Sequence, residues 1–142
     1  MGESPQAVRA WVREKLIREA GENGPPATMA AAAEHILRPL SAHLARLVGD
    51  AGFEALLARA VALARREVPA LCADPGGGQE GLVQCLREME GEHVCGSATA
   101  VVTALVDLLA SFVGVDLATS LLREAWPDLP EMGDGAERAG DT

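Results

Sequence analysis

Apolar residues recur at every third or fourth position along most of the chain, which is the spacing of one buried face of an α-helix. The clearest case is 50–71, where one face is apolar and the other carries Glu54, Arg59 and Arg65. No segment alternates apolar and polar residues over the length of a strand. We therefore expect an all-α fold, a single-domain bundle of five or six helices over residues 4–127.

Helix caps and helix breakers place the expected boundaries. The second helix should run from the capping residue Thr28 to Gly49, and Pro69 should end the third. Pro39 falls inside the second helix. Because proline removes a backbone hydrogen bond and clashes with the preceding turn, we expect a kink or a break in this helix near Arg38.

Composition changes this picture only at the C-terminus. The chain has 142 residues, of which 49% are apolar and 23% are charged, as in an ordinary globular domain. The segment 128–142 differs, because it holds five acidic residues, one basic residue and few apolar ones. We expect it to form a flexible acidic tail outside the bundle.

The net charge of −9 narrows the classes of partner. Nucleic-acid binding draws much of its affinity from Lys and Arg side chains that neutralise phosphates, so binding to nucleic acid or to an anionic membrane surface is not expected. The first ten residues lack the apolar run of a secretory signal, and the three cysteines have no framework spacing. We expect a cytoplasmic protein, and its arginine-rich, alanine-rich composition suggests a bacterial source.

The stretch GEHVCG, residues 91–96, brings a histidine and a cysteine within two positions of each other. A structural zinc site uses four ligands, most often in two close pairs. Only His93 and Cys95 form such a pair here, with Cys85 further upstream. We interpret the stretch as a turn between two helices and expect no metal or other cofactor, with a site at Cys85, His93 and Cys95 as the alternative.

Catalytic patterns are absent from the sequence. No nucleophile elbow is present, and the glycine-rich segment 75–79 lacks the Lys-Ser/Thr pair of a phosphate-binding loop. The two other histidines, His35 and His43, are about 12 Å apart along a helix, which is too far to share one metal ion. Whether the protein is an enzyme stays open, and we expect that it is not.

The segment 98–115 is apolar almost all round, which indicates either a membrane span or a fully buried helix. Asp107 lies in its middle, so burial is favoured over a span. A chain this small has few other helices to cover such a segment, and a second copy could supply the cover. We therefore expect a homodimer interface, although the same residues would suit a monomer core. The predicted interface residues are Val102, Leu105, Val106, Leu109, Phe112, Val113, Leu121, Leu122 and Trp126.

These observations indicate a small cytoplasmic protein that acts through protein–protein interaction, in an adaptor or regulatory role. It should associate with itself through the helices in 98–126 and bind another protein. The alternative function is a helical sensor or carrier that holds a ligand or a metal at His93, Cys95 and Cys85.

Overall fold

The computed structural model describes residues 3–21, 25–69, 71, 78–89 and 91–127 of the chain. Its five helices are α1 (Glu3–Ala20), α2 (Pro26–Glu67), α3 (Gly78–Glu88), α4 (Gly91–Val113) and α5 (Val115–Ala125). The described residues contain no strand, which confirms the predicted all-α fold and the predicted number of helices. The predicted acidic tail, 128–142, lies outside the described residues, as does Cys72.

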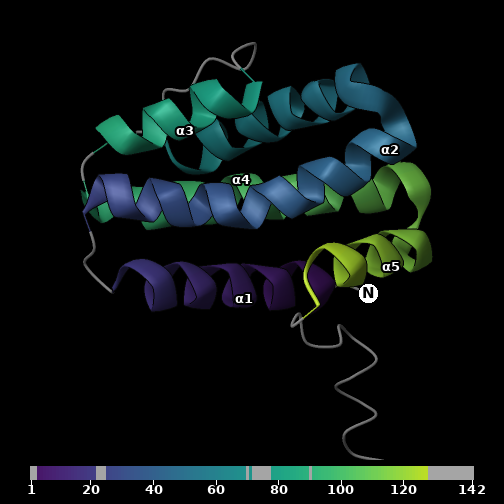
Figure 1. The fold of residues 1–142 in the computed structure, drawn as a ribbon, viewed down its shortest axis with the longest axis horizontal. Coiled ribbons are helices and arrows are strands. Elements are labelled where there is room, and N and C mark those ends of the chain that lie inside the picture. The colour runs from purple at the N-terminus through teal and green to yellow at the C-terminus, as the bar shows by residue number, and fades with distance from the viewer. Residues whose placement is uncertain (1–2, 22–24, 70, 72–77, 90, 128–142) are drawn as a thin grey trace, which may run out of the picture.

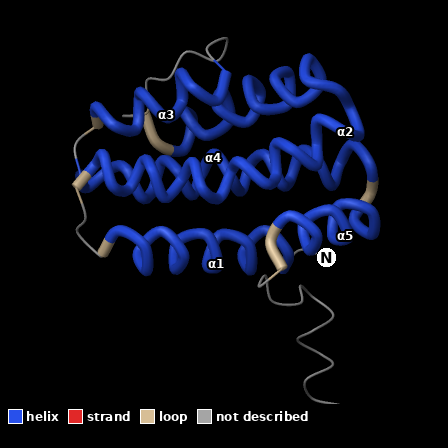
Figure 2. The backbone as a smooth tube through the Cα atoms, in the orientation of Figure 1, coloured by secondary structure: helices blue, strands red, loops and turns tan. Residues whose placement is uncertain are grey.

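The helices form a bundle of roughly antiparallel rods (Figure 1). Helix α1 and the shorter α5 lie end to end along one edge, and the first half of α2 crosses the middle of the bundle in front of α4. The second half of α2 and α3 cover the opposite edge. Figure 2 shows that the bend of α2 and the connection from α4 to α5 lie at the same end of the bundle.

Helix α2 contains the two helices that the sequence predicts as its second and third. They meet at Gly49, whose backbone dihedrals (φ 83°, ψ 166°) are non-helical. A positive φ of this size is costly for any residue with a Cβ, so glycine is required at this corner. Pro39 lies inside the helix, where no non-helical dihedral is found. The chain does not break at Pro39, and a kink there stays a prediction.

The core is centred on α4, which contacts each of the other helices. Its buried side chains are mostly Val, Leu and Ala, and small side chains of this kind allow neighbouring helices to approach closely. Three buried hydroxyls, those of Ser97, Thr99 and Thr103, have no hydrogen-bond partner among the described residues. Burying a hydroxyl without a hydrogen-bond partner lowers the stability of the fold, so each of these three positions carries a free-energy cost.

Two tryptophans tie α5 to the rest of the bundle. The rings of Trp11 and Trp126 stack with their centroids 4.8 Å apart and their planes tilted by 34°. The indole Nε1–H of Trp126 donates a buried hydrogen bond of 2.9 Å to the carbonyl oxygen of Ile36 on α2. Trp126 therefore holds the end of α5 against both α1 and α2, although it follows the last helical residue of α5.

Candidate interaction surface

The stretch GEHVCG is helical and forms the first turns of α4, so the prediction of a turn there was wrong. Successive helical residues are about 100° apart, which places His93 and Cys95 about 200° apart, on opposite sides of the helix. Val94, between them, is fully buried, and Ala98 one turn later is 2% exposed. Packing of these residues outweighs the low helix propensity of Gly91 and Gly96.

The alternative metal site finds no support in this geometry. His93 and Cys95 diverge, and Cys85 lies on another helix, α3, where it is partly buried against the core. The part of the chain that the structure describes has no group of three His, Cys, Asp or Glu side chains able to hold a metal ion. A partly buried cysteine packed against apolar neighbours behaves as a small apolar residue.

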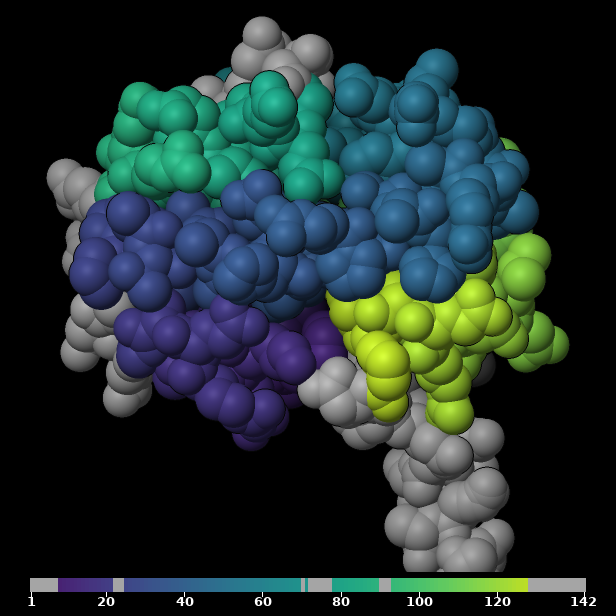
Figure 3. Space-filling view, in the orientation of Figure 1, coloured from purple at the N-terminus to yellow at the C-terminus, as the bar shows by residue number. Residues whose placement is uncertain are grey.

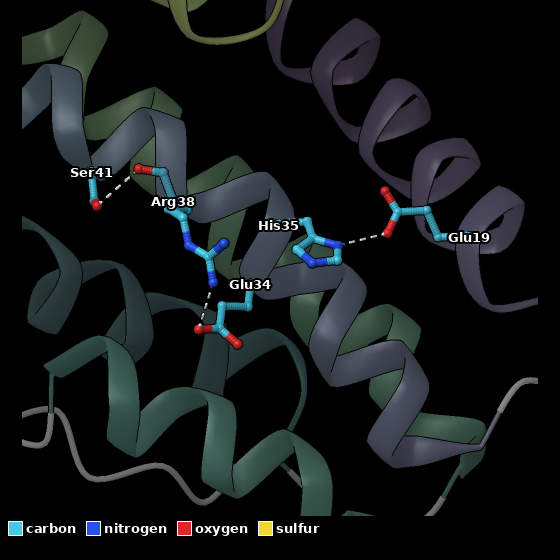
Figure 4. Close-up of polar contacts among 5 residues, drawn as sticks. All are labelled: Glu19, Glu34, His35, Arg38 and Ser41. Carbon is cyan, nitrogen blue, oxygen red and sulfur yellow. Dashed lines mark hydrogen bonds and ion pairs between the residues drawn. The ribbon is translucent and has the colours of Figure 1, made fainter.

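The other two histidines, His35 and His43, lie on α2 and each contacts a carboxylate of a neighbouring helix; Figure 4 shows the pair formed by His35. His35 points away from the core, and its Nδ1 lies 3.1 Å from a carboxylate oxygen of Glu19 on α1. His43 is less exposed, with Nδ1 2.9 Å from the carbonyl oxygen of Pro39 and Nε2 3.7 Å from Glu124 on α5. These pairs connect α2 to its neighbours, and exposed pairs of this kind each contribute little stability.

Arg38 and Glu34 form a further pair on the same helix, 3.2 Å apart (Figure 4). The hydroxyl of Ser41 donates to the carbonyl oxygen of Arg38 at 3.1 Å. Both contacts lie within one helix: Glu34 and Arg38 are four residues apart, and Arg38 and Ser41 are three residues apart. They belong to the solvated side of α2 and do not converge on a common point where a reacting group could be held.

The structure divides the predicted interface residues into two groups. Six of them are at most 4% exposed and lie in the core of a single chain: Val102, Leu105, Val106, Leu109, Leu122 and Trp126. Their burial is supplied by the chain itself, so a second copy cannot reach them in this conformation. The other three, Phe112, Val113 and Leu121, keep accessible surface, and Phe112 is 65% exposed.

Four large apolar side chains are exposed among the described residues, and all four lie near the two corners of the backbone. They are Leu47, Phe112, Val115 and Leu117, which we call the apolar corner. Leu47 precedes the break at Gly49, and the other three flank Gly114, which separates α4 from α5 with φ 95°. Figure 3 shows α2, the end of α4 and α5 side by side at this end of the molecule.

Charged residues of both signs are sequence neighbours of the apolar corner. Arg46 and Asp50 flank Leu47 on one side, and Asp116 lies between Val115 and Leu117 on the other. All three are exposed. A two-fold axis sets one part of a surface against another part of its copy, so a surface that carries charges of both signs can form opposite-charge pairs with a copy of itself.

Sequence reasoning found only part of this surface. It named Phe112 but not Leu47, Val115 or Leu117. Val115 was missed because 98–115 was treated as one apolar segment that continues without a break. The available signal was Gly114: apolar side chains on both sides of a helix break cannot all face the same core.

One helical segment, His93–Val113, is long and apolar enough to cross a membrane by length and composition. Just over half of its most apolar window is buried inside the protein. The core helix of a bundle has the same two properties, so this observation does not set α4 apart from a buried helix.

We compared the chain with models of protein families, with curated proteins and with solved structures, and none of the three comparisons gave a match.

Proposed function

We propose that the protein acts through protein–protein interaction and forms a homodimer in which the apolar corner of one copy packs against that of a second. The observation that carries this proposal is the position of the four exposed large apolar residues of the described chain, Leu47, Phe112, Val115 and Leu117, beside two corners at one end of the bundle. Single exposed apolar residues are common on soluble proteins, whereas a group at one place favours an interaction site.

The strength of such a dimer can be estimated from the exposure of these side chains. Fully burying a large apolar side chain is worth roughly 1.5–3 kcal/mol. The four are 44%, 65%, 54% and 45% exposed, so about half of that value remains to be gained at each. Over the eight side chains of two copies this amounts to roughly 6–12 kcal/mol, against an association cost of about 4–15 kcal/mol. We therefore expect a weak dimer whose population depends on concentration.

The charges at the edge of the corner support pairing with a second copy rather than with a strongly charged partner. In an isologous dimer the exposed Arg46 of one copy would lie near Asp50 or Asp116 of the other. Such pairs add little affinity but help to set the orientation. We place the protein in the cytoplasm of a bacterium, in an adaptor or regulatory role, without nucleic acid or membrane as partners.

Sedimentation velocity over a hundredfold range of concentration tests the proposal. The wild-type chain should shift from monomer to dimer as concentration rises, and Phe112→Asp should stay monomeric while keeping its helical circular dichroism. Ala62→Asp is the matched control, because Ala62 is exposed on the second half of α2 and the change adds the same charge. A wild-type chain that stays monomeric throughout, or a Phe112→Asp variant that dimerises as the wild type does, would refute the proposed dimer.

A further inference from the structure

The surface contains a recess where α1, the second half of α2 and α4 meet. Its volume is about 180 Å³. A water molecule takes about 30 Å³ of liquid, so the recess has room for about six waters or one small organic molecule. We call it the α4 recess, and it is lined by Arg9, Leu63, Ala64, Glu67, Ala100, Thr103, Ala104 and Asp107.

The lining has an apolar floor and a charged rim. Ala64 and Ala100 are each 2% exposed, and their small side chains leave the space that larger residues would fill. The charged residues come one from each helix: Arg9 from α1, Glu67 from α2 and Asp107 from α4. A ligand that combines a short apolar body with one polar group matches this arrangement.

The net charge of the rim determines whether the polar group of the ligand should be positive or negative. The guanidinium of Arg9 donates to both carboxylate oxygens of Glu67, at 2.9 Å and 3.3 Å, so its charge is largely matched by Glu67. Asp107 then leaves one negative charge in excess. Burial raises the pKa of the Asp107 carboxyl, and the Arg9 guanidinium lowers it by less. The charged form of Asp107 is therefore short of compensating partners, although the residue itself is exposed.

Thr103 offers a second polar atom at the same place. It lines the recess at 4% exposure, and its Oγ1 has no hydrogen-bond partner among the described residues. The Oγ1 is covered by protein atoms in this conformation. Threonine populates two χ1 rotamers in helices, so rotation about one bond can offer the hydroxyl to a ligand. A hydroxyl that is unpaired without a ligand gains a hydrogen bond when one is present.

We propose that the α4 recess binds a small primary alkylammonium compound, with its ammonium group at the Asp107 carboxylate and its alkyl chain on the alanine floor. Anionic ligands are disfavoured by the excess negative charge. A metal ion is disfavoured because only two carboxylates line the recess and Arg9 already occupies one of them. The single lysine of the chain, Lys15, lies over the ring of Trp11 and does not line the recess.

Titration with n-butylamine, followed by amide chemical shifts in NMR, tests the proposal at neutral pH. The probe should bind saturably, with the largest shifts at Ala100, Thr103, Ala104 and Asp107. The neutral isostere n-butanol should bind at least tenfold more weakly, since it lacks the charge that Asp107 recognises. Absence of saturable binding, equal affinity for the alcohol, or shifts confined to other residues would overturn the proposal.

Two variants and one control locate the site. Asp107→Asn keeps the shape of the side chain, and we expect about a tenfold loss of affinity, the size expected for one hydrogen bond to a charged group. Ala104→Leu should abolish binding by filling the recess. Glu14→Gln removes an exposed carboxylate of α1 that lies outside both the recess and the apolar corner, and it should leave affinity unchanged. If Asp107→Asn binds as tightly as the wild type, Asp107 is not the recognition group and the proposal fails.

Affinity should also fall as pH is lowered through the raised pKa of Asp107, because the protonated carboxyl no longer attracts the ammonium. The charged groups that face Asp107 across the recess are Arg9 from α1 and Glu67 from α2. The alkylammonium titrates near the pKa of a lysine side chain, about 10.4, and stays charged throughout. Asp107→Asn should flatten this dependence. The recess shares no residue with the apolar corner, so binding and dimerisation can fail separately.

Discussion

Replacing Trp126 tests whether this residue belongs to the core of a single chain, where the structure places it, or to a dimer interface, where the sequence placed it. The replacement separates the two because a core residue stabilises the monomer. Trp126 is 3% exposed, stacks on Trp11 and donates a hydrogen bond to Ile36 at 2.9 Å. Truncating a buried tryptophan to alanine costs about 3–5 kcal/mol, through lost burial and the cavity that remains. We therefore expect Trp126→Ala to lose a large part of the 5–15 kcal/mol of stability that is usual for a domain.

A second substitution divides this loss into parts. Trp126→Phe keeps a ring against Trp11 but removes the indole donor to Ile36. A hydrogen bond of this kind contributes about 0.5–1.5 kcal/mol net, and the aromatic pair about the same beyond its area. We expect Trp126→Phe to cost about 1–2 kcal/mol, clearly less than Trp126→Ala. Leu117→Ala, at an exposed position of α5, should cost under 1 kcal/mol and serves as the control.

Urea unfolding measures these differences, provided that the protein concentration is low enough to keep the chain monomeric. The midpoint should fall in the order wild type, Trp126→Phe, Trp126→Ala, with an unchanged slope. Emission from the two buried tryptophans of the wild type, and from Trp11 alone in the two variants, should shift to the red in a single transition. A Trp126→Ala variant within 0.5 kcal/mol of the wild type, but defective in dimerisation, would refute the core position and restore Trp126 to the interface.

Two further predictions concern the backbone corner and the buried hydroxyls. Gly114→Ala should destabilise the chain by about 1–2 kcal/mol, because φ is 95° there and an added Cβ meets no other atom, so the loss is conformational strain alone. Gly96→Ala, at a helical position with equal space, should instead gain about 0.5–1 kcal/mol in the same unfolding assay, and equal effects at both sites would contradict this reasoning. Thr99→Val should stabilise the chain by about 1 kcal/mol, since the buried hydroxyl has no partner among the described residues, whereas Thr119→Val on the partly exposed α5 should change little. A clear loss of stability in Thr99→Val would show that the hydroxyl makes a bond.

The hydrophobic pattern predicted the helices and their buried faces well, because spacing along a helix depends only on local geometry. Leu40, Leu44 and Leu57 all lie in the core, as their periodic positions indicate. The break at Gly49 was also predictable, as a glycine between two amphipathic segments. The prediction was wrong at the start of α4. Two glycines there suggested a turn, but the burial of Val94 and Ala98 against the core keeps the chain helical.

The site was less predictable than the fold. A helix that is apolar all round must be covered, but the sequence cannot say whether its own chain or a second copy covers it. The structure shows that α4 contacts every other helix, which accounts for the burial of Val102, Leu105 and Leu109. The α4 recess also depends on contacts between distant segments. Arg9 and Glu67 are 58 residues apart, and no local pattern signals that they meet.

The apolar corner can be exposed for two physical reasons, and they have different consequences. At a sharp corner the outward side chains have no helix of their own chain to cover them, so some exposure follows from geometry alone. If that were the whole cause, Phe112 would still contribute to the monomer through the part of its side chain that is covered, and Phe112→Asp would lower monomer stability without changing assembly. If the exposed part is covered by a second copy, the same substitution should lower monomer stability by the same amount and should also lower the association constant. Comparing unfolding and sedimentation of this one variant therefore distinguishes an incidental corner from a binding surface.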